Sequence, residues 1–127
     1  MPAKSRPISA DLVPAVRDAW SVGIRVGSKP HRFIRIWAVV VGHRVFARSW
    51  SLSPGGWYRT LVAEKRGVLQ VGRKAAPFRA VRARGDALKA AVDRAYLRKY
   101  PRPTEAHYAH DLCWPRSRAT TLELRLE

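Results

Sequence analysis

Apolar residues recur every three or four positions in two stretches of the chain. Between these two stretches they follow the alternating spacing that is typical of strands. Residues 11 to 21 and 85 to 100 therefore predict two amphipathic helices. Ser9 or Asp11 is expected to cap the first helix, with Pro14 in its first turn. The two helices frame a central region of a different character.

β-Branched and aromatic residues fill this central region and favour strands. Residues 32 to 41 predict one long strand, and the Gly42-His43 turn returns the chain into a partner strand over residues 44 to 50. Further strands are expected at residues 24–27, 68–71, 78–83 and 120–126, with a connection over 72–77, alternating buried and wet positions in the last strand, and a short helix at 57–65. This order predicts a mainly β domain (α+β), a small antiparallel β-barrel with flanking helices.

The length of 127 residues fits one domain, expected over residues 9–127 after a flexible basic arm at 1–8. A single cysteine, Cys113, excludes an intrachain disulfide and a four-thiolate zinc site. His107, His110 and Cys113 are too few for a convincing metal site, so no metal is expected. The longest apolar run, residues 36–41, is too short for a membrane span, which predicts a cytoplasmic protein.

The net charge of +16 is unusual, and it is concentrated between residues 25 and 84, where fourteen Lys and Arg residues accompany one acid, Glu64. One interpretation is a positive groove for an anionic ligand, and the other is a solvated surface with an arginine content set by codon bias. Nucleic acid is an alternative partner, because five Trp residues could stack on bases. In the last helix Lys89 and Asp93 have the spacing of an ion pair.

The segment from Arg48 to Arg59 leaves a strand, turns through Gly55-Gly56 and enters a helix. This segment offers donors that suit a phosphate: arginine guanidinium groups, serine hydroxyls and free backbone N–H groups at a helix start. Its flat aromatic faces suit a planar ring. The expected cofactor-binding residues are Arg48, Ser49, Ser51, Gly55, Gly56, Trp57, Tyr58 and Arg59. The alternative is a polar hairpin exit in which Trp57 and Tyr58 are ordinary core residues.

Four sequence stretches resemble a family of small bacterial proteins of uncharacterised function in the split-barrel superfamily. They are Ile36-Trp37-Ala38-Val39 leading to Val45-Phe46-Ala47-Arg48-Ser49, then Gly56-Trp57-Tyr58-Arg59, then residues 91–96 with 99–100, and residues 119–124. The superfamily includes flavin-binding pyridoxamine phosphate oxidase-like proteins and deazaflavin-dependent nitroreductases. In the nitroreductase-like relatives a Lys and a Gly usually hold the cofactor phosphate, where this chain has Arg48, Ser49, Ser51, Gly55 and Gly56.

The resemblance implies a six-stranded antiparallel split β-barrel, a homodimer, and FMN or a deazaflavin coenzyme as a small anionic cofactor. Oxidoreductase chemistry would then be hydride transfer by the cofactor, without a catalytic side chain. Trp37, Tyr108 and Trp114 are the candidates for the substrate side. Relatives without any cofactor also exist, so an accessory protein that retains the fold is an alternative.

Overall fold

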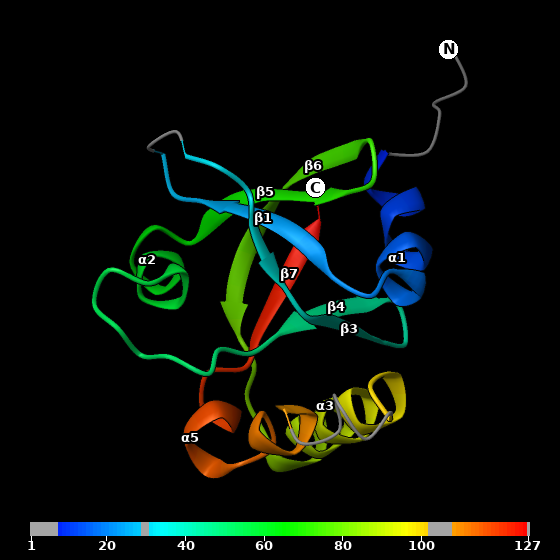
Figure 1. Ribbon diagram of the computed structural model, residues 1–127, viewed down its shortest axis with the longest axis vertical. Helices are drawn as coiled ribbons and strands as arrows, with labels where there is room; N and C mark the ends of the chain where they lie inside the picture. Colours follow the sequence, from blue (N-terminus) through cyan, green and yellow to red (C-terminus); the bar gives the residue numbers. More distant parts are fainter. Residues whose placement is uncertain (1–7, 29–30, 102–107, 127) are drawn as a thin grey trace.

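Seven antiparallel strands form one sheet that curls into a nearly closed barrel (Figure 1). This computed structural model describes residues 8–28, 31–101 and 108–126. The strands are β1 (Val22–Val26), β2 (Ile34–Ile36), β3 (Ala38–Val41), β4 (Arg44–Ala47), β5 (Arg66–Val71), β6 (Lys74–Arg82) and β7 (Leu122–Leu126). Their order in the sheet is β2-β1-β5-β6-β7-β4-β3, so the two edge strands are neighbours in the sequence.

The barrel has seven strands where six were expected, because the predicted long strand is broken at Trp37. Its first part, β2, pairs with β1, and its second part, β3, pairs with β4. The carbonyl oxygen of Trp37 accepts a hydrogen bond of 2.8 Å from the Tyr96 hydroxyl instead of continuing a strand ladder. One bent segment therefore supplies both edges of the sheet and brings them together.

Helices surround the barrel in the part of the chain that the structure describes: α1 (Ile8–Asp18), α2 (Trp57–Glu64), α3 (Asp86–Lys99) and α5 (Pro115–Arg118), with residues 108–111 also helical. The positions of α2 and α3 confirm the sequence predictions. Both ends predicted for the first helix were wrong, since α1 ends at Asp18 and already includes Ser9 and Asp11, with Pro14 in its interior. In Figure 1, α1 and α2 lie on opposite sides of the barrel, with α3 and α5 below it.

Two strand predictions also need correction. The turn between β5 and β6 is only Gly72-Arg73, and residues 74–77 belong to β6, with Pro77 opposite Val68. The alternation expected in the last strand holds for the leucines but not for Thr121 and Glu123, which are 2% and 6% exposed. The Glu123 carboxylate pairs with Arg44 and Arg125.

Apolar side chains form two clusters. The first fills the barrel and includes Val16 of α1 together with Tyr58 and Leu61 of α2. The second lies between α3 and the outer face of the sheet, where Phe46 of β4 meets Val92 of α3. Over residues 8–28, 31–101 and 108–126, no helix combines the length and hydropathy that a membrane span requires. The predicted basic arm, apart from Ile8, and His107 lie outside the described residues.

Candidate functional site

A groove of about 560 Å³ runs between α2 and the connection from β1 to β2. Gly55, Trp57 and Thr60 line it on the α2 side. The remaining lining residues are Val26, His31, Arg32, Ile34 and Glu64. Trp57 is half-buried, because part of it packs against the barrel core while the groove lies beside it. This volume is within the range of about 300–1,000 Å³ that is typical of small-molecule sites.

The loop before α2 is held by its own serines. The Ser49 hydroxyl donates to the Ser51 carbonyl at 2.7 Å and accepts from the Ser51 N–H at 3.1 Å. The Ser51 hydroxyl in turn accepts from the Ser53 N–H, and the Gly56 N–H donates to the Ser53 carbonyl. No side chain caps the start of α2 at Gly56, so its first N–H groups keep their capacity to bind an anion.

Across the groove, His31 fixes the β1–β2 connection. Its Nε2 lies 3.1 Å from the Val26 nitrogen and 3.2 Å from the Val26 carbonyl oxygen, and its Nδ1 lies 2.6 Å from the carbonyl oxygen of Arg32. Arg32 is exposed and lines the groove, so its guanidinium is a cationic group of the groove wall.

Arg48 is not part of this groove. Its side chain is fully buried and donates to the Thr121 hydroxyl at 2.9 Å, the Leu112 carbonyl at 3.0 Å and the Lys89 carbonyl at 2.9 Å. It also forms an ion pair with Asp93. The guanidinium is therefore committed to internal partners, and the phosphate role predicted for Arg48 does not fit this geometry.

The Arg48 network joins α3 to the barrel. Asp93 receives Arg48 on one carboxylate oxygen and Arg118 on the other, and within the described residues it does not form the predicted pair with Lys89. Burial raises the pKa of the Tyr96 hydroxyl, which keeps its proton and donates to the Trp37 carbonyl while accepting from the Arg48 N–H. Sequence analysis singled out Arg48, Lys89 and Asp93 but not the contacts that join Arg48 to Asp93.

The other predicted site residues divide between the groove and the core. Ser49 and Tyr58 are buried, at 5% and 7% exposure. Arg59 is exposed and donates from Nε to the Leu52 carbonyl at 3.1 Å, which secures the loop. Gly55 and Trp57 line the groove, while Ser51 and Gly56 shape its approach. The groove thus retains part of the predicted set and adds His31 and Arg32, which the sequence analysis missed.

An aromatic cluster surrounds the strand break. The Trp37 ring stacks on Tyr100 with centroids 3.8 Å apart, and its neighbours Trp20, Trp50 and Tyr108 meet it edge-on. Trp20, Trp50 and Tyr108 are 41%, 42% and 50% exposed. The structure therefore brings together Trp37 and Tyr108, two of the three residues predicted for the substrate side.

Trp114, the third of these residues, has no ring contact with the cluster among the described residues and is 64% exposed. It is the residue before α5, at the N-cap position. Nothing in this placement connects Trp114 to the aromatic cluster or to the groove.

A family of bacterial proteins matches most of the chain. Its model, described as an uncharacterized protein conserved in bacteria (DUF2255), matches residues 19–124. The chain belongs to this family. All residues lining the groove beside α2 lie within the matched region of the DUF2255 family. Among the curated proteins, none matches the chain.

The fold has a counterpart among solved structures. The crystal structure of the conserved hypothetical protein Rv2991 from Mycobacterium tuberculosis is similar, with a TM-score of 0.59 and 11% sequence identity. The alignment covers 98% of this chain and 82% of that protein. At this identity the likeness concerns the fold, which this DUF2255 protein therefore shares over nearly its whole length.

Proposed function

We propose that this DUF2255 protein is a split-barrel protein that binds FMN or a deazaflavin coenzyme in the groove beside α2. The observation that carries the proposal is the groove itself, about 560 Å³ with Trp57 on one side and Arg32 among its other lining residues. An aromatic face and a cation in one hollow suit a ligand with a planar ring and an anionic tail. The resemblance to flavin- and deazaflavin-binding barrels supports the same class of ligand.

The residues present fit such a ligand without Arg48, Ser49 or Tyr58. Trp57 offers a ring surface, and Gly55 leaves room beside it, since a Cβ at Gly55 would meet no atom within 4 Å. Arg32 supplies the charge, and the uncapped start of α2 supplies N–H donors. The residues proposed to bind the ligand thus come from the loop before α2 and from the β1–β2 connection, which face each other across the groove.

The chemistry supplied by such a cofactor when bound is hydride transfer. The chain's own residues have to bind and orient the ring, and no nucleophile or acid–base pair is needed for that. Trp37 and Tyr108 remain the candidates for contacts to a substrate, because the structure brings them into one exposed aromatic cluster. The homodimer implied by the resemblance is part of the same proposal.

The test is a titration of the purified protein with FMN and with a deazaflavin coenzyme, followed by cofactor fluorescence. Trp57→Leu should weaken binding about tenfold, because stacking on an aromatic ring contributes about 1–3 kcal/mol. Trp114→Leu is the matched control and should bind as the wild type. Absence of binding by both cofactors, or equal losses in the two variants, would contradict the proposal.

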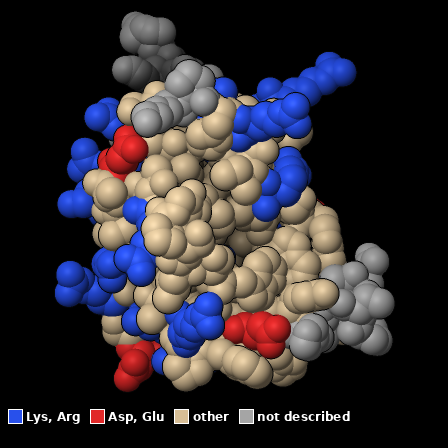
Figure 2. All heavy atoms as spheres, turned by 60° about the vertical axis from the view of Figure 1, so that its left-hand side comes forward, with Lys and Arg blue, Asp and Glu red and all other residues tan. Residues whose placement is uncertain are grey.

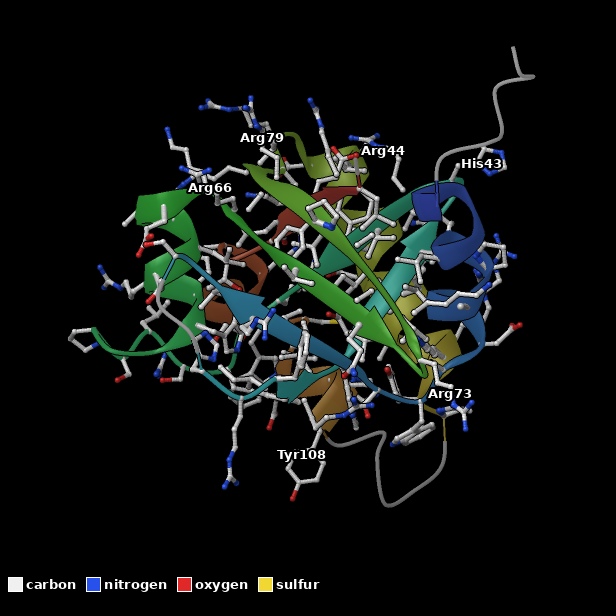
Figure 3. All side chains as sticks on the ribbon, turned by 90° about the horizontal axis from the view of Figure 1, so that it is seen from above. His43, Arg44, Arg66, Arg73, Arg79 and Tyr108 are labelled. Atoms are coloured by element: carbon white, nitrogen blue, oxygen red, sulfur yellow. The ribbon has the colours of Figure 1, made fainter. Side chains whose placement is uncertain are left out.

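Nucleic-acid binding, the alternative partner, is less well served by this geometry. Figure 3 places Arg44, Arg66 and Arg79 on one side of the molecule and Tyr108 of the aromatic cluster on the opposite side. A single strand that stacks on the aromatic cluster would not reach those arginines at the same time. Binding to a single-stranded oligonucleotide that weakens steeply between about 50 and 200 mM salt would favour it nonetheless.

A further inference from the structure

Strands β5 and β6 place two arginines directly opposite each other. Arg66 and Arg79 are register partners, both are exposed, and Figure 3 shows their side chains on the same side of the barrel. Figure 2 looks onto the α2 side of the molecule and shows Lys and Arg side chains along its left-hand edge. Like charges in this position repel, so the pair needs an explanation.

The pairing brings these two side chains close together. In the neighbouring pair the Ala80 N–H donates to the Lys65 carbonyl at 2.9 Å, so Lys65 and Ala80 are a hydrogen-bonded pair. Arg66 and Arg79 are then the adjacent non-hydrogen-bonded pair, in which side chains of antiparallel strands approach most closely. Their Cβ atoms are expected to lie about 4.5–5.5 Å apart.

One carboxylate, that of Glu123, pairs with the two arginines that continue this row but not with Arg66 or Arg79. Arg125 is the register partner of Arg79 on β7, and Glu123 binds Arg125 at 3.2 Å and Arg44 at 2.9 Å. Among the described residues, no carboxylate pairs with Arg66 or Arg79. The positive charge of this pair is therefore not neutralised within residues 8–28, 31–101 and 108–126.

A second groove, of about 620 Å³, contains both arginines and Lys65. Lys65 has a φ of 64°, and it is the one non-glycine residue with positive φ in the described part of the chain. Gly67 is required beneath the groove, because a Cβ there would lie 2.4 Å from the Arg25 carbonyl oxygen. The remaining lining residues are Gly27, Glu64, Val68, Pro77 and Phe78.

We propose that Arg66, Arg79 and Lys65 form a binding site for a phosphoryl group. Two arginine forks can hold the oxygens of one phosphate in a defined orientation, and a lysine adds a point charge. Glu64 also lines the groove, but one of its carboxylate oxygens accepts from the Ser28 N–H at 3.1 Å and from the Ser28 hydroxyl. The site thus carries three cations and one engaged acid.

The phosphoryl group has two sources with the same chemistry. One source is the phosphate of a cofactor bound in the groove beside Trp57, because Glu64 lines both that groove and the groove of Arg66 and Arg79. A free phosphorylated metabolite is the other. Only the first source depends on the proposed cofactor function.

The test measures binding of inorganic phosphate and pyrophosphate by calorimetry and by the shift in Tm. Arg79→Gln should lower pyrophosphate affinity about tenfold or more, because it removes a charged hydrogen-bonding group. Without ligand its Tm should not fall, since the substitution relieves repulsion. Arg73→Gln, which changes the charge equally at the far turn of the same hairpin, is the matched control and should bind as the wild type (Figure 3).

FMN and riboflavin, which differ by the phosphate, separate the two sources. If Arg79→Gln weakens FMN but not riboflavin, the cofactor is the source; if it weakens pyrophosphate alone, the source is a free metabolite. Both results support the site, and the second does so even if FMN fails to bind. No binding of pyrophosphate, equal losses in Arg79→Gln and Arg73→Gln, or binding of oligonucleotides alone would overturn it.

Discussion

Replacing Arg48 by methionine removes every donor of a buried guanidinium while keeping an unbranched apolar side chain. Three acceptors lose a hydrogen bond of 2.9–3.0 Å, namely the Thr121 hydroxyl and the carbonyls of Leu112 and Lys89. Each buried group left unsatisfied costs about 1–3 kcal/mol. Asp93 keeps its bond to Arg118, so the total should resemble that of a broken buried ion pair, about 3–5 kcal/mol.

The assay is urea unfolding followed by circular dichroism, with thermal unfolding as a second measurement. With an unfolding entropy of about 2.1 cal/mol/K per residue, a loss of this size lowers the Tm by about 10–20 °C. Arg59→Met is the matched control, because Arg59 is exposed and its Nε donates to one carbonyl. Its cost should stay below about 1 kcal/mol.

The opposite pattern would refute this reasoning. If Arg48→Met unfolded at the wild-type urea concentration and lost affinity for FMN, the guanidinium would be a ligand group and not a structural one. Arg48→Lys adds a further comparison. Lysine keeps the charge but not the planar guanidinium, so Arg48→Lys should still lose most of the stability that Arg48 contributes.

Elements with local causes could be predicted from the sequence. Helix α2 ends where predicted, with Lys65 as its C-cap, and the periodicity of α3 is confirmed. The turn at Gly42 is confirmed as well, since Gly42 has a φ of 65° that other residues rarely adopt. In each case the deciding interactions lie within a few residues along the chain.

The break at Trp37 depends on a distant contact and could not be predicted in this way. The hydroxyl that donates a hydrogen bond to the Trp37 carbonyl belongs to Tyr96, 59 positions further along the chain. Pro77 misled the prediction for a different reason. Proline lacks the N–H that a central strand needs, but Pro77 precedes Phe78, the first β6 residue that pairs with β7 in the described part of the chain.

The candidate site was predicted only in part, because sequence shows charge but not whether the charge is available. Arg48 and Arg59 look equivalent in the chain, yet Asp93 and three carbonyl or hydroxyl groups from distant segments enclose Arg48. The scarcity of acids was the signal that could have shown this. In a chain with nine acids, an aspartate in the middle of a helix is a candidate partner for a buried arginine.

Three further predictions follow from single contacts. The guanidinium of Arg44 holds the pKa of Glu123 below its ordinary value. This pair therefore stabilises the fold above about pH 4.3 and loses that contribution as the pH falls through the lowered pKa. Glu123→Gln should cost about 1–2 kcal/mol at pH 7 in urea unfolding, and this cost should shrink at pH 3. Gly67→Ala should cost at least about 1–3 kcal/mol in the same assay, because the new Cβ meets a backbone oxygen at 2.4 Å, and a wild-type midpoint would show that β1 can yield. Burial lowers the pKa of Lys99 to about 8, below that of the unfolded chain, so the unfolded state binds more protons between about pH 8 and 10 and the free energy of unfolding gains from this group as the pH rises. Lys99→Met removes this titration. The urea midpoint of the wild type should therefore rise relative to that of the variant between about pH 7.5 and 9.5. A constant difference would show that the ammonium group is as well solvated in the folded protein as in the unfolded chain.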